Sequence, residues 1–291
     1  MDWTKAKTIL IVAFLITNLL LVAALVTDPT RQQAAGVTEA YLQQTLAFLE
    51  DENVVLETPL PRQTPSLSAI TVTYRFFENS MITRLLGDNW EQIAPHTYQG
   101  TGGRVTITND KLLAWQPAEP LSPPADLREE TLETVSQALL ENYDLSTGGL
   151  TLSQIYLGMV PEYDAEPLHK LVYEQTYQGR FVGESYVHVY MNQRGVVAVE
   201  ALLLEDPAAS DQTGTPRVMI SAPEALLRKL DEIGRVHRGD GPVVVSRVEA
   251  GYYFALTQDP FTQWESVASG TAVPAWKIVL KNGTTFYQEA F

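Results

Sequence analysis

The chain has 291 residues, a formal net charge of −15 and no cysteine. The lack of cysteine excludes disulfides, thiolate metal ligands and cysteine nucleophiles. Hydrophobic residues make up 45% and charged residues 19% of the chain, values that are typical of a folded globular protein. Because phosphate backbones repel a strongly acidic surface, we do not expect a nucleic acid as a partner.

The first expected element is a transmembrane helix close to the N-terminus. Residues 8–27 (TILIVAFLITNLLLVAALVT) carry no charge, and twenty helical residues span about 30 Å, the thickness of a hydrocarbon core. Lys5 and Lys7 precede this segment, so the positive-inside rule places residues 1–7 in the cytoplasm and the rest of the chain outside the cell. A cleaved signal peptide is the alternative, but the apolar segment is longer than a usual signal-peptide core.

Two polar residues, Thr17 and Asn18, lie in the middle of this apolar segment. An amide at the bilayer midplane has no water to bond, so it is expected to bond to another helix, with a gain on the order of 1 kcal/mol. Alternatively, Asn18 is a tolerated polar residue in a helix that only anchors the protein. The sequence leaves both interpretations open.

Residues 28–120 are predicted to form a first α+β module outside the membrane. Apolar spacing predicts a helix over 37–49, and the Thr, Val and aromatic residues of 69–77 predict a strand. Asn109-Asp110 lies between two short apolar runs, which is typical of a tight hairpin. A cluster of four prolines between residues 117 and 124 then predicts a domain boundary.

The second part, residues 125–291, is predicted to contain two similar units, 125–206 and 216–291. Each begins with a candidate capping box, Asp126 with Glu129 and Ser221 with Glu224, and continues into strands. Helices segregated from runs of strands indicate an α+β fold rather than alternating α/β. The predicted strands are 168–177, 185–191, 196–204, 243–248, 252–256 and a final hairpin around Asn282-Gly283.

No motif indicates catalysis or metal binding. The four histidines, His96, His169, His188 and His237, are not spaced as metal ligands, and His188 alternates with tyrosines as a packed sheet residue would. The glycine-rich run 100–104 lacks the lysine of a phosphate loop and precedes a strand, so we interpret it as a flexible turn. We therefore expect no catalytic residue, no cofactor and no metal. Paired carboxylates of a glycosidase stay an alternative that only geometry can test.

Several short patterns along the chain are distinctive when taken together. Near the N-terminus these are Met1-Asp2-Trp3, Lys5, 7–9 (KTI), Phe14-Leu15 and Asn18; further on they are 173–179 (YEQTYQG), 195–197 (GVV), 274–278 (PAWKI), Asn282-Gly283 and Phe286-Tyr287. In these patterns the chain resembles the YycI family. Lys277 stands where the family's motif is expected to carry Arg, which keeps the charge.

The resemblance implies a membrane-anchored accessory protein of Gram-positive bacteria, with repeated helix-plus-antiparallel-sheet modules of PepSY type outside the cell. Members of that family associate with a sensor histidine kinase, YycG or WalK, and with a sister protein, YycH, in a two-component system for cell-wall metabolism. Trp3, Thr17 and Asn18 would then contribute to contact with the kinase's transmembrane helices. Two alternatives belong to other classes: an anchored extracellular solute-binding or protease-inhibiting module, and a carboxylate-based cell-wall hydrolase.

Overall fold

The protein is described here from a computed structural model. Its described residues are Phe14, 36–146, 149–158, 168–206, 211–236, 241–254 and 267–291. Trp3, Thr17 and Asn18, and all of the expected anchor 8–27 except Phe14, lie outside them. Within the described ranges, none of the helices combines the length and the apolar character needed to cross a membrane.

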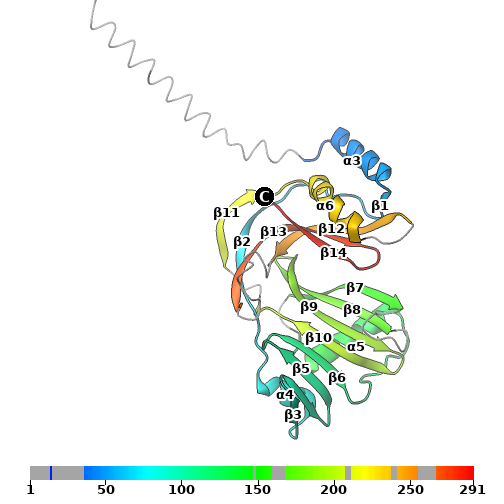
Figure 1. Ribbon diagram of the computed structural model, residues 1–291, viewed down its shortest axis with the longest axis vertical. Helices are drawn as coiled ribbons and strands as arrows, with labels where there is room; N and C mark the ends of the chain where they lie inside the picture. The colour runs from blue at the N-terminus through cyan, green and yellow to red at the C-terminus, as the bar shows by residue number, and fades with distance from the viewer. Residues whose placement is uncertain are drawn as a thin grey trace, which may run out of the picture.

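The described strands form one continuous 14-stranded sheet, which bends between an upper and a lower half in Figure 1. The lower half is antiparallel throughout and is built by the middle of the chain. In spatial order its strands are β7 (Leu150–Gly158), β8 (Leu168–Tyr177), β9 (Arg180–Asn192), β10 (Gly195–Leu202), β6 (Leu112–Pro117), β5 (Gly103–Thr108), β4 (Thr97–Gly100) and β3 (Glu91–Ala94).

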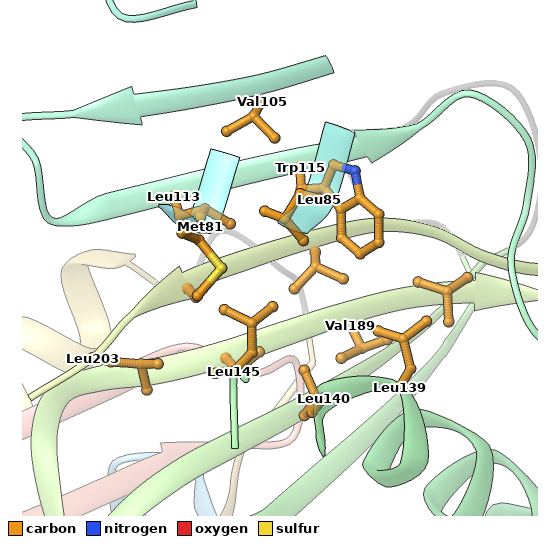
Figure 2. Close-up of a cluster of buried hydrophobic side chains, with 14 of the residues drawn as sticks. Met81, Leu85, Val105, Leu113, Trp115, Leu139, Leu140, Leu145, Val189 and Leu203 are labelled. Atoms are coloured by element: carbon orange, nitrogen blue, oxygen red, sulfur yellow. The ribbon is translucent and has the colours of Figure 1, made fainter. Parts of the chain in front are cut away.

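Two helices, α4 (Asn79–Leu86) and α5 (Glu129–Asn142), pack against the core of the lower half. Figure 2 shows Met81 and Leu85 of α4 beside Trp115 of β6, with Leu139 of α5 facing Val189 of β9. All five side chains are buried. Burying a side chain of this size contributes roughly 1.5–3 kcal/mol, so these contacts account for the attachment of both helices to the sheet.

The upper half combines both ends of the described chain. Its strands are β1 (Val54–Leu56), β2 (Ser66–Thr73), β11 (Gln212–Val218), β12 (Val243–Tyr253), β13 (Ser269–Leu280) and β14 (Thr285–Glu289), with the helices α3 (Glu39–Asp51) and α6 (Ala222–Val236). Leu226 and Ile233 of α6 share a buried cluster with Trp276 and Ile278 of β13. The indole Nε1 of Trp276 donates to the carbonyl of Ile220 at 2.8 Å, which satisfies the one polar atom of this buried ring.

The strand β9 belongs to both halves. Its C-terminal part, from Tyr186 onward, pairs with β8 and β10, and its first two residues, Arg180 and Phe181, also pair with β8. Between these parts, Val182 and Gly183 pair in parallel with β12. The two halves of the sheet therefore meet at residues 182–185 (Figure 1). The candidate site lies where β9 passes from one half of the sheet to the other.

The α+β class predicted from the sequence is confirmed, with the sheet as its larger part. The segment 28–120 contributes strands to both halves of the sheet. In the upper half β1 pairs with β12 and β2 with β13, and in the lower half β6 pairs with β10. Whether 28–120, 125–206 and 216–291 form separate modules stays a prediction. Residues 243–253 form one strand instead of the two predicted, because Glu249 and Ala250 pair with Lys277 and Trp276 without interruption.

The two predicted capping boxes have different outcomes. Ser221 is confirmed as a cap, since its Oγ accepts from the backbone N–H of Glu224 at 3.4 Å. Asp126 is not the cap of α5, which begins at Glu129 with Arg128 at the N-cap position. Asp126 instead accepts hydrogen bonds from the backbone N–H and the side-chain Nε of Arg128, so it closes a turn that precedes the helix.

Candidate functional site

A cavity of about 230 Å³ lies where the two halves of the sheet meet. Residues of β7, β8 and β9 line it from the lower half, and residues of β12, β13 and β14 line it from the upper half. Its wall combines charged and aromatic side chains, which is typical of a site with polar groups that orient a ligand. We call it the junction cavity.

One carboxylate of the cavity wall, Glu174 of β8, belongs to a buried cluster of charges. Lys277 of β13 is fully buried, and its Nζ lies 2.5 Å from Glu174 Oε2 and 2.6 Å from Glu249 Oε1 of β12. The ammonium group also lies 4.5 Å from the centre of the Phe181 ring. A buried ammonium is stable only when it is paired, so this cluster ties β8 of the lower half to β12 and β13 of the upper half.

A second polar contact, made by Arg247 of β12, joins the two halves at another side of the cavity. Its Nη1 donates to Ser153 Oγ at 2.8 Å, and its Nη2 donates to the Ser153 carbonyl and to Gln154 Oε1, both at 3.0 Å. Tyr156 donates its hydroxyl to the same Gln154 oxygen at 2.9 Å. The guanidinium is thus held by three hydrogen bonds to β7, which fixes its orientation.

Glu184 lines the cavity at the point where β9 passes between the halves. Its backbone φ is +64°, a left-handed conformation that costs a residue with a Cβ on the order of 1–2 kcal/mol. Burial raises the pKa of the Glu184 carboxyl above its usual range. Among the described residues, no side chain or backbone group forms a hydrogen bond or an ion pair with this carboxylate.

Tyrosines form the apolar part of the wall. The ring of Tyr287 stacks on Tyr253 with centroids 4.4 Å apart and planes 14° apart, and burial raises the pKa of Tyr287 well above its usual value. A Cβ placed on Gly183 would lie 2.8 Å from Cε1 of Tyr287. Glycine at this position therefore allows the aromatic pair to lie directly against β9.

His188 lines the cavity in the arrangement that the sequence predicts, on one face of β9 with two tyrosines. It stacks on Tyr186 at 4.2 Å, and its Nδ1 lies 3.4 Å from Glu200 Oε2, which also accepts from the Tyr190 hydroxyl at 3.0 Å. The hydrogen bond from His188 is the main reason why the pKa of Glu200 is lowered. Within the described ranges, no three His, Asp or Glu side chains are placed to hold a metal ion.

None of the residues that line the junction cavity was predicted from the sequence to form a site, although His188 and Tyr287 were named for other reasons. Trp3, Thr17 and Asn18, the site residues predicted from the sequence, lie outside the described part of the chain, as does His237. A lysine inside an apolar strand, such as Lys277, is a signal that was available in the sequence. Glu184 carries no such signal, because its isolation depends on strands that are distant in the chain.

Known proteins resemble this chain in both sequence and fold. A sequence model of the YycI family, described as "YycI protein", matches residues 32–291. The crystal structure of YycH from Bacillus subtilis is similar in fold, with 12% sequence identity and a TM-score of 0.50 over 78% of this chain. The chain spans about half of that structure, 53% of its length. No sequence among curated proteins matches the chain. Since the family match covers nearly all of its length, the chain belongs to the YycI family.

Proposed function

We propose that this protein is a membrane-anchored accessory regulator that associates with the sensor histidine kinase YycG/WalK and with the sister protein YycH, and so modulates the kinase. The observation that carries the proposal is the family match over residues 32–291, and the YycH-like fold supports it. The anchor is residues 8–27, with residues 1–7 in the cytoplasm and the rest outside the cell. The protein acts by binding rather than by catalysis.

The anchor supplies the contact with the kinase. An interhelical hydrogen bond from Asn18, with Thr17 and Trp3 next to it, favours one arrangement of the kinase's transmembrane helices over another. A regulator needs only this difference in affinity for two arrangements to shift their populations.

The helix α3 supplies a surface for YycH. Eleven residues separate the expected anchor from α3, so this helix lies within about 40 Å of the bilayer surface, where an anchored partner is also held. Tyr41 and Phe48 are seven residues apart on one face of α3, and they are 37% and 48% exposed. Val55 of β1, which follows α3 in the chain, is 48% exposed. Exposed aromatic residues of this kind are enriched in protein–protein interfaces.

Photo-cross-linking in living cells tests the proposal. A photoreactive amino acid is placed at Asn18, at Phe48 or, as a control, at Leu157, which is 67% exposed on β7 in the lower half. We expect the kinase to be captured from Asn18, YycH from Phe48 and neither from Leu157. Capture of neither partner from Asn18 or Phe48 would contradict the proposed association.

A further inference from the structure

We propose that the junction cavity is a binding site for a small aliphatic molecule with a primary ammonium group, which pairs with Glu184. The site goes beyond the proposed contacts with the kinase and YycH, because it lies inside the fold, between the halves of the sheet. It would let a soluble molecule in the surroundings act on the protein.

In and beside the cavity, the carboxylates outnumber the cationic side chains by one. Arg247 is engaged with β7 and lies 3.6 Å from Glu249, and Lys277 is engaged with two carboxylates. Lys170 lies 5.4 Å from the Tyr190 ring and helps to lower the pKa of Glu200, so its charge is also directed at an acid. Three cations therefore face four carboxylates, which are Glu174, Glu184, Glu200 and Glu249. The surplus negative charge belongs to Glu184, which has no partner among the described residues.

A cation is the ligand that this arrangement favours. A carboxylate that is partly removed from water gains from a positive charge within reach, because the interaction is stronger in a low dielectric medium. An anion would be repelled by the unpaired Glu184 and would find no free cation, because the nearby cations already have partners. Tyr186 and Tyr287 add aromatic rings to the wall, and such rings pack on aliphatic chains.

The site is also preorganised. The left-handed backbone of Glu184, with φ +64°, holds strain in a position that the neighbouring strands enforce. Tyr186 is fixed by stacking on His188, and Tyr287 by stacking on Tyr253. The volume of about 230 Å³ suits a ligand the size of a free amino acid or a short diamine.

Isothermal titration calorimetry on the full-length protein in detergent micelles tests the proposal. The probe is cadaverine, a five-carbon diamine, and its matched control is glutarate, a five-carbon dicarboxylate. We expect cadaverine to bind with a Kd on the order of 1 mM or tighter and to raise Tm, and we expect glutarate to do neither.

Two variants locate the binding. Glu184→Gln keeps the size of the side chain and removes its charge, so it should weaken cadaverine binding at least tenfold. Glu119→Gln makes the same change in net charge at an exposed position and should bind as the wild type does. Unchanged affinity in Glu184→Gln, tighter binding of glutarate, or no binding of 20 mM cadaverine by the folded wild type would each overturn the proposal. Circular dichroism confirms that each variant is folded.

Discussion

The ammonium group of Lys277 lies 2.5 Å from the carboxylate of Glu174, although 103 residues separate them in the chain. The pair joins β13 of the upper half to β8 of the lower half, and Glu249 of β12 completes it at 2.6 Å. Lys277 is fully buried, and its two partners are 20% and 36% exposed, so the ammonium group is removed from water and held between two carboxylates. Lys277 therefore contributes to the union of the two halves, beside the contact of Arg247 with β7 and the pairing of β9 with β12.

Replacing Lys277 should destabilise the protein strongly. Lys277→Met removes the ammonium group that both carboxylates share, and breaking a buried pair costs about 3–5 kcal/mol. The loss should lie at the lower end of that range, because both carboxylates are partly exposed and Arg247 lies 3.6 Å from Glu249. Lys277→Arg keeps the charge and should lose much less. Urea unfolding at pH 7.5 measures both variants. Equal midpoints for Lys277→Met and the wild type would show that the cluster does not hold the halves together.

Replacing Gln175 should destabilise the protein almost as much as replacing Lys277, although Gln175 carries no charge. Its fully buried amide donates to the Leu204 carbonyl at 3.1 Å and accepts from the Leu204 N–H at 2.7 Å. Gln175→Leu leaves two buried backbone groups without this partner, which should lower the free energy of unfolding by about 2–3 kcal/mol. Gln137→Leu, on the exposed face of α5, should change it by less than about 0.5 kcal/mol. Similar urea midpoints for the two variants would contradict this account.

Two glycines should respond to alanine in opposite directions. A Cβ on Gly251 would lie 2.5 Å from the Phe181 backbone oxygen, so Gly251→Ala should destabilise the protein by about 1–3 kcal/mol. At Gly234 in α6, no atom of the described residues outside its own helix lies within 4 Å of such a Cβ. Gly234→Ala should therefore stabilise by about 0.5–1 kcal/mol through reduced freedom of the unfolded chain. Calorimetric Tm values check both signs, and a stabilising Gly251→Ala would be inconsistent with the packing at β9.

Glu184 should make stability depend on pH. Because its pKa is raised in the folded state, ionisation of this group destabilises the fold as pH rises through that raised pKa. Glu184→Gln removes this cost, so its Tm should exceed that of the wild type by a few degrees at pH 7.5. The difference should vanish as pH falls below the ordinary carboxyl pKa, where the wild-type group is neutral in both states.

The control for this prediction is Glu119→Gln, at an exposed position outside the cavity. Its Tm should follow the wild type across the same pH range. The charged side chains that line the cavity with Glu184 from other strands are Lys170, Glu174 and Arg247. Tyr74, Tyr253 and Tyr287 also interact with Glu184, and these tyrosines stay neutral over this range. A difference between Glu184→Gln and the wild type that does not change with pH would exclude titration of Glu184 as its cause.

The sequence predicted those features that short segments determine. Asn109 and Asp110 adopt the positive φ values of a tight hairpin, at +52° and +57°, and the final hairpin turns at Asn282-Gly283 as expected. Ser221 caps α6 through a neighbour three residues away. Each of these features depends on residues that are adjacent or nearly adjacent in the chain, so local pattern is sufficient.

Features that depend on distant contacts were missed. The helix α4 is only eight residues long, and its apolar residues gain their burial from β5 and β6. The strand β9 begins at Arg180 instead of Ser185, because Arg180 and Phe181 pair with β8 and the next two residues pair with β12. The junction cavity has the same origin, since its walls come from residues 153 to 287. The spacing of residues along the chain carries no information about such long-range contacts.

The measurement that tests the central claim most directly is the transcription of a kinase-controlled cell-wall gene in a strain that lacks this protein. We expect altered output in the deletion strain and restoration of normal output by the wild-type chain. We expect Asn18→Leu and Phe48→Glu not to restore it. Leu157→Glu should restore output as the wild type does. Unchanged output in the deletion strain would contradict the claim that this protein regulates the kinase.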